Sequence, residues 1–251
     1  MWKHCNDNTE AIITAKKHIE SCHRKVSVKL PETALLFYMH GGVEYAKTKF
    51  QTTLISERFP SFLNSRPVYK INGENVCFLS GGWGAPMAAD TVETLCELGV
   101  KNIITVGMCG VFSESSVIGD IIIPYKAFVE EGVSFHYYEF IESSFPDKQL
   151  YKSALDFYEG VKALPIVSTD AVYRQTFYKE ELWRKKGAVG VDMETSAIFS
   201  ISTYLGMKAV SILIASDKHP INEGEDNWKW TITREMRCDL FDKCINFAIS
   251  I

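Results

Sequence analysis

Short apolar runs alternate along the chain with longer amphipathic segments. The runs are rich in Val, Ile and Leu, have the length of strands, and span 33–39, 102–107, 120–124, 164–168, 188–192 and 209–216. Helical periodicity follows them, over 86–98, 150–161, 176–186, 194–205 and 234–248. Strands that alternate with helices predict an α/β fold. We expect a single domain with a twisted, mostly parallel or mixed central sheet and helices on both faces.

Local turn signals refine this pattern. Asn72-Gly73 in the segment 68–82 predicts a hairpin, because Asn-Gly readily adopts the positive φ values of a type I′ turn. Gly99 is expected to end the helix 86–98.

The first 30 residues have a pattern of their own. One helical face would carry Ile12, Ile13, Ala15, Ile19 and Cys22, with Asn8 or Thr9 as its cap. We therefore expect a peripheral helical segment at 1–30 and the main domain at 31–251.

Composition narrows the class of protein. The 251 residues carry a net charge of −4 and no basic stripe, which argues against a nucleic-acid partner. The seven cysteines form no C-x-x-C pair, and several lie in apolar runs, so buried reduced thiols are favoured over disulfides or a metal site. The start has no apolar signal-peptide core, and no run is long enough to span a membrane. These features predict a cytoplasmic protein.

Glycines and polar residues gather where the predicted strands end, which is where open α/β sheets bind ligands. The segments concerned are 40–42, 81–84, 107–110, 168–170, 192–194 and 216–217. Each alone is also explained by a tight turn between a strand and a helix, and none matches a dinucleotide or P-loop motif.

Taken together, the segments are similar to one family. GAVGVDMETSAIFSISTYLGMKAVSILIASD (187–217), ELGVKNIITVGMCGVFSESSVIGDIIIP (97–124) and SGGWGAPMAADTVETL (80–95) resemble the nucleoside phosphorylase superfamily, over roughly residues 33–250. EEGVSFHYYEF (130–140) and STDAVYRQT (168–176) resemble its uridine-phosphorylase-like branch. The resemblance implies a small-molecule nucleoside substrate, inorganic phosphate as co-substrate with no other cofactor, and a homo-oligomer, either a dimer or a hexamer. The six histidines are scattered and form no cluster with cysteines, so no metal site is expected.

The resemblance also implies roles for individual residues. Glu194 matches the carboxylate that accepts hydrogen bonds from the ribose hydroxyls, with a simple helix-start carboxylate as the alternative. Met193 would pack beneath the ribose, and His136 would reach its 5′ end from a neighbouring subunit. Asp217 matches the residue that donates a proton or hydrogen bond to N7 of a purine, which requires burial to raise its pKa.

The identity of the base stays open at this point. Asp217 favours a purine, whereas the segments 130–140 and 168–176 favour the uridine branch. Candidate base-binding residues, besides Asp217, are Phe135, Tyr137, Val172 and Arg174.

The phosphate or water site departs from the family. Where phosphorylases carry I-R-V-G-[ST], this chain has Ile-Thr-Val-Gly-Met, and the first loop lacks the arginine of G-D-P-x-R. The residues at these positions are Gly41, Gly42, Thr105, Gly107 and Met108.

Either phosphate or water could therefore accept the sugar. Phosphate would need other cations, for which the candidates are Lys47, Arg58, Arg66 and Arg174. Water would need a group to orient it, for which the candidates are Glu44, His40 and Glu194.

Three functions follow from these observations. Phosphorolysis of a nucleoside to free base and pentose 1-phosphate leads, with a purine slightly favoured. Hydrolysis by a nucleosidase and nucleoside binding without turnover are the alternatives, and both are motivated by the missing arginine. A dehydrogenase is disfavoured because the dinucleotide fingerprint is absent.

Overall fold

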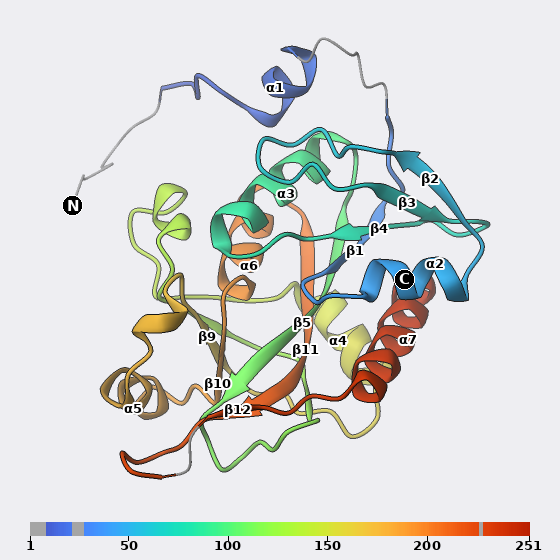
Figure 1. Ribbon diagram of the computed structural model, residues 1–251. Helices are drawn as coiled ribbons and strands as arrows, with labels where there is room; N and C mark the ends of the chain where they lie inside the picture. Colours follow the sequence, from blue (N-terminus) through green and yellow to red (C-terminus); the bar gives the residue numbers. More distant parts are fainter. Residues whose placement is uncertain (1–8, 22–27, 226–227) are drawn as a thin grey trace.

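The computed structural model describes residues 9–21, 28–225 and 228–251. A mixed sheet crosses the molecule, with helices on both sides (Figure 1). The strands are β1 Thr33–Phe37, β2 Thr52–Ser56, β3 Val68–Ile71, β4 Val76–Ser80, β5 Asn102–Val111, β6 Ile121–Ile122, β7 Ala127–Val129, β8 Ser143–Ser144, β9 Ile166–Ser168, β10 Gly190–Asp192, β11 Lys208–Lys218 and β12 Lys229–Trp230. The helices are α1 Ala15–Ser21, α2 Gly42–Lys49, α3 Ala85–Glu97, α4 Lys148–Phe157, α5 Phe177–Lys185, α6 Thr195–Tyr204 and α7 Arg234–Ser250. Two 3₁₀ turns are η1 Val133–His136 and η2 Val172–Arg174.

The long strand β5 organises the sheet. It runs parallel to β1 and β11, and its last residues pair antiparallel with β10. The strand order on one side is β2-β3-β4-β1-β5-β10-β9-β7-β8, while β11 also pairs with β6 and β12. Consequently β5 and β11 end side by side, β1 ends earlier, opposite Val106, and β10 pairs near the end of β5.

Burial on both faces explains why the strands read as continuous apolar runs. In β1, Ala34 and Leu36 pack into the core on the side of α3 and α6, whereas Leu35 and Phe37 pack into the core on the side of α4 and α7. Successive residues of a strand point to opposite faces, so a strand covered on both sides has no polar positions to alternate. The predicted α/β class is confirmed.

Most of the predicted elements are present, including the hairpin of β3 and β4, where Gly73 has φ 87°. Gly99 follows α3 with φ 95°, as expected for a residue that ends a helix. Five of these helices and strands were not predicted: α2 and β2 have polar residues that give weak periodicity, and β7, β8 and β12 are only two or three residues long.

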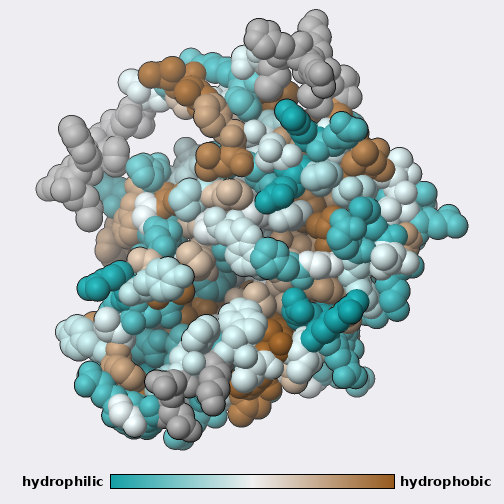
Figure 2. All heavy atoms as spheres, viewed as in Figure 1, coloured by the Kyte–Doolittle hydropathy of each residue, from teal (hydrophilic) through white to brown (hydrophobic). Residues whose placement is uncertain are grey.

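The N-terminal helix is shorter than predicted. It begins at Ala15, and Thr14 Oγ1 accepts a hydrogen bond from Lys17 N (3.1 Å), which replaces the cap expected from Thr9. Ile12 and Ile13 precede this helix and are exposed, whereas Ile19 packs against the core. Figure 2 shows hydrophobic colouring over this N-terminal stretch. Asn8 and Cys22 lie outside the described residues.

Five cysteines lie in the described parts of the chain, and all five are free thiols. Burial raises the pKa of Cys77 and of Cys244 to about 12, which keeps both thiols protonated and unreactive. Cys5 and Cys22 are outside the described residues. Across the described ranges, no helix combines the length and apolar character needed to cross a bilayer.

Candidate active site

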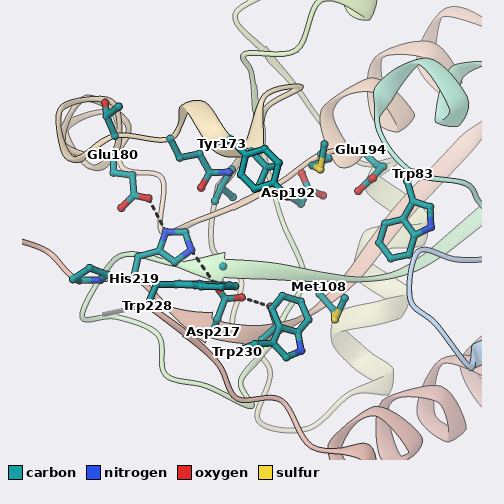
Figure 3. A pocket seen from close by; sticks show the side chains of 18 of the residues that line it. Trp83, Met108, Tyr173, Glu180, Asp192, Glu194, Asp217, His219, Trp228 and Trp230 are labelled. Carbon is teal, nitrogen blue, oxygen red and sulfur yellow. Dashed lines mark hydrogen bonds and ion pairs between the residues drawn. The ribbon is translucent and has the colours of Figure 1, made fainter. Parts of the chain in front are cut away.

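A cavity of about 450 Å³ opens at the carboxyl ends of β1, β5, β10 and β11. Its floor comes from these strands, and its rim comes from η2, the start of α5 and the segment around β12 (Figure 3). The polar side chains that line it include Tyr38, Glu180, Asp192, Glu194, Ser216, Asp217 and His219. Of the strand ends predicted to bind a ligand, the segments 81–84, 107–110, 192–194 and 216–217 contribute to this cavity, whereas 40–42 and 168–170 do not line it.

Asp217 lies at an irregularity in β11. Ala215 pairs with Cys109 and Asp217 pairs with the next residue, Gly110, so Ser216 forms a bulge. Bulges of this kind redirect side chains beside active sites. Asp217 Oδ1 accepts a hydrogen bond from Ser216 Oγ (2.5 Å), and Asp217 Oδ2 accepts one from Trp228 Nε1 (2.5 Å).

His219 completes a row of three titratable groups. Its Nε2 lies 3.0 Å from Asp217 Oδ2, and its Nδ1 lies 2.6 Å from Glu180 Oε1. Burial alone would disfavour the charged forms of Asp217 and His219. Their mutual hydrogen bond outweighs this effect, together with the donors Ser216 and Trp228 for Asp217 and the acceptor Glu180 for His219. The pKa of Asp217 is consequently lowered, and the pKa of His219 is raised to about 9. The expected rise in the pKa of Asp217 is therefore wrong.

A glycine makes room for this row. A Cβ atom on Gly110 would lie 2.4 Å from His219 Nε2 and 3.0 Å from Asp217 Oδ2. Any larger residue at this position of β5 would displace the imidazole or the carboxylate.

Glu194 lies on the other side of the cavity, next to the start of α6 (Figure 3). Its Oε1 accepts a hydrogen bond from Gly84 N (2.6 Å), and its side chain is buried. Asp192, rather than Glu194, caps α6, because Asp192 Oδ2 accepts from Thr195 N (3.1 Å) and Thr195 Oγ1 (2.5 Å). Burial, together with the charge of Asp192, raises the pKa of Glu194.

Tyr38 follows β1 and lines the cavity near these carboxylates. It is 4% exposed, and its hydroxyl has no hydrogen-bond partner among the described residues. Gly81 allows the ring to lie here, since a Cβ atom on Gly81 would approach the ring to 2.3 Å. A buried hydroxyl without a partner is costly, so the Tyr38 hydroxyl is available to a ligand.

Aromatic side chains form the walls of the cavity. They are Trp83, Tyr173, Phe177, Trp228 and Trp230, and all five are at least a third exposed. Trp228 and Trp230 pack edge to face with 6.2 Å between ring centroids. Such walls offer stacking surfaces for a planar group.

The other predicted sugar and base residues divide into two groups. Met193 and Val172 line the cavity, as do Glu194 and Asp217. The remaining residues do not: Phe135 and His136 lie on η1 and are exposed, Arg174 is exposed on η2, and Tyr137 donates to Glu93 Oε1 (3.0 Å) beside a different cavity.

Of the residues predicted for phosphate or water, Met108 lines the cavity. Thr105 is buried within the sheet and donates to Ser211 Oγ (2.7 Å), and Gly107 packs near Leu213. Gly41 is the exposed residue before α2, and Gly42 lies against Phe37. These four residues therefore do not line it.

The candidate cations and water-orienting groups of the first loop also lie elsewhere. Lys47 bonds Glu44 Oε2 (3.0 Å), and Arg58 and Arg66 are exposed outside the cavity. His40 packs on Trp83, with 5.1 Å between ring centroids, and does not itself line the cavity. Among the side chains that the structure describes, no lysine or arginine lines the cavity.

Sequence reasoning missed His219, Glu180, Tyr38 and the aromatic walls. A signal for His219 was present, because residues i and i+2 of an extended chain point to the same face and His219 follows Asp217 by two. Nothing local links Glu180 to either residue, since it comes from α5, 39 positions before His219.

Comparison with known proteins gives one family. Residues 44–245 match the model of the phosphorylase superfamily. The chain is 30% identical to a guanosine phosphorylase of Halorubrum lacusprofundi, over 56% of this chain and 60% of that protein. It is 29% identical to a DeoD-type purine nucleoside phosphorylase of Clostridium novyi, over 71% of this chain and 76% of that protein. A DeoD-type purine nucleoside phosphorylase of Bacillus cereus is 27% identical over 70% of this chain and 75% of its own length.

Proposed function

The chain belongs to the phosphorylase superfamily, and from that premise we propose that it is an enzyme that cleaves the N-glycosidic bond of a purine nucleoside, with inorganic phosphate as the acceptor. The observation that carries the proposal is the placement of two carboxylates, Glu194 and Asp217, at opposite sides of one cavity (Figure 3). The printed names of the similar proteins, guanosine and purine nucleoside phosphorylases, support the purine.

The chemistry explains why these groups would be needed. As the bond breaks, positive charge develops on the ribosyl ring and negative charge on the departing base. Glu194, anchored by Gly84 N, would accept from the ribose hydroxyls and oppose the positive charge. Asp217 would face the base, and Met193 would pack beneath the sugar. The aromatic walls, with Val172, would hold the planar base by stacking.

Product analysis tests this proposal. The purified protein is incubated with guanosine, inosine, adenosine or uridine, with and without phosphate, and free base and sugar products are separated by chromatography. We expect guanine or hypoxanthine together with ribose 1-phosphate, only when phosphate is present. Release from uridine at the same rate as from guanosine would contradict the purine preference.

Hydrolysis is the second candidate function, because no described lysine or arginine side chain lines the cavity to hold a phosphate dianion. It predicts free ribose and an unchanged rate in phosphate-free buffer. Nucleoside binding without turnover predicts thermal stabilisation by guanosine and no base release.

We further propose a homo-oligomer. Phe135 and His136 lie on η1, away from the cavity of their own chain, so their predicted roles at the sugar and base require the cavity of a neighbouring subunit. Light scattering of the purified protein would measure the number of subunits, and a monomer would contradict this proposal. The cytoplasmic location stays a prediction.

A further inference from the structure

We propose that His219 stores the proton that the leaving base receives, that Asp217 passes this proton on, and that Glu180 is the positioning residue for the imidazole. The proposal rests on the proposed function, since it concerns the departure of the base from the same cavity. It deepens that function by assigning the acid to a residue outside the segments that resemble the family's motifs.

The hydrogen-bond geometry fits a doubly protonated imidazole. Both ring nitrogens of His219 face carboxylate oxygens, at 3.0 Å from Asp217 Oδ2 and 2.6 Å from Glu180 Oε1 (Figure 3). A neutral imidazole has one N–H donor, so one carboxylate would face a lone pair. The imidazolium donates to both carboxylates, and the pKa of His219 is accordingly raised to about 9 even though burial opposes its charge.

Asp217 alone is a poor source of the proton. Its two oxygens accept from Ser216, Trp228 and His219, and these donors hold its pKa below the ordinary value of an aspartate. In the resting site Asp217 is therefore a carboxylate, and the acidic proton next to it is on His219 Nε2.

The charges around His219 fit this role. Two carboxylates face the ring, Asp217 from β11 and Glu180 from α5. A cation, Arg184, lies behind Glu180, with its Nη1 3.9 Å from Glu180 Oε2. Lys218 donates to backbone carbonyls of Ser113 and Ser116. On the other sides, the Phe112 ring packs at 6.4 Å between centroids, and Asp192 and Glu194 line the same cavity. With the side chain of His219 only 13% exposed, the imidazolium is stabilised chiefly by its two carboxylates.

The proposed step involves the departing base, Asp217 and His219. The bond between the anomeric carbon and the base nitrogen breaks, and its electron pair goes to the base. His219 Nε2 gives its proton to Asp217 Oδ2, and Asp217 then gives this proton to N7 of the purine. The products are a neutral base, a neutral imidazole and an aspartate carboxylate, and the acceptor binds the sugar carbon. Solvent returns the proton to His219 afterwards.

Two substrates separate this chemical role from a structural one. Guanosine needs a proton at N7, whereas 7-methylguanosine already carries a substituent and positive charge there. In His219→Gln we expect kcat for guanosine to fall about 100-fold or more, as general acid catalysis typically contributes. With 7-methylguanosine at pH 6, we expect a change of less than about threefold. His18→Gln, on α1, is the matched control and should behave like the unaltered protein.

Equal losses for both substrates, or no loss for guanosine, would overturn the proposal while leaving the proposed function intact. Absence of turnover of every nucleoside by the unaltered protein would instead refute the proposed function. Glu180→Gln is the second variant in case His219→Gln does not fold. It removes one carboxylate from the imidazolium, so the alkaline limb of the guanosine rate should move from about pH 9 to lower pH. An alkaline limb that does not move would contradict the role of Glu180.

Discussion

Replacing Glu194 by glutamine tests the sugar side of the cavity. The amide oxygen of Gln can still accept from Gly84 N, so the side chain should keep its place. At a pH at which Glu194 is ionised, what is lost is the negative charge offered to the ribose hydroxyls. Hydrogen bonds to charged groups contribute about 1.5–3 kcal/mol, against about 0.5–1.5 for neutral ones. For two hydroxyls the loss is therefore about 2–3 kcal/mol, or roughly a 30- to 150-fold fall in kcat/KM.

The loss of activity in Glu194→Gln should not be accompanied by a loss of stability. Burial and the charge of Asp192 raise the pKa of Glu194, so its ionised form is disfavoured in the folded protein. A group with a raised carboxyl pKa costs stability once the pH is high enough to ionise it, and the neutral amide removes that cost. Glu194→Gln should therefore melt at the same temperature as the unaltered protein, or higher.

The assay is the initial rate of base release from guanosine and from 2′-deoxyguanosine, with thermal melting in parallel. The variant should lose less with the deoxynucleoside, which has one hydroxyl fewer to bind. Glu97→Gln, an exposed carboxylate at the end of α3, is the matched control. Activity within threefold of the unaltered protein, or an equal loss with both substrates, would refute the reasoning.

Three further predictions concern the same cavity. Tyr38→Phe removes a buried hydroxyl without a partner, so melting should show no loss of stability, while KM should rise several-fold if the hydroxyl binds ligand; an unchanged KM would remove Tyr38 from the binding residues. Gly110→Ala puts a methyl group 2.4 Å from His219 Nε2, so kcat for guanosine should fall at least tenfold, and full activity would contradict the role of that imidazole. In the unaltered protein kcat/KM should be bell-shaped with pH: it falls on the acid side as Glu194 is protonated, above the ordinary range of a carboxylate, and on the alkaline side near 9 as His219 loses its proton. A profile that stays flat up to pH 10 would contradict the second assignment.

The architecture was accessible from the sequence because it depends on long apolar runs. The strands β1, β5 and β11 are buried on both faces, and their composition shows it directly. Short elements such as β7, with three residues, carry too little periodicity to be recognised. The predicted start of α1 was too early because Ile12 and Ile13, although apolar, are exposed and do not belong to a buried helix face.

The site was accessible only in part. Glu194 and Asp217 lie at strand ends with recognisable flanking residues, and both line the cavity. The pKa of Asp217 could not be predicted, because it depends on Trp228 and His219 rather than on burial alone. Glu180 reaches the site through tertiary packing of α5, which no local pattern encodes.

The most direct test of the central claim is the release of free base from guanosine by the purified protein in phosphate buffer, measured beside Glu194→Gln. Our account predicts release of guanine by the unaltered protein and a rate roughly 30- to 150-fold lower in the variant, by the same count of charged hydrogen bonds. No release of base from guanosine, inosine, adenosine or uridine would contradict it.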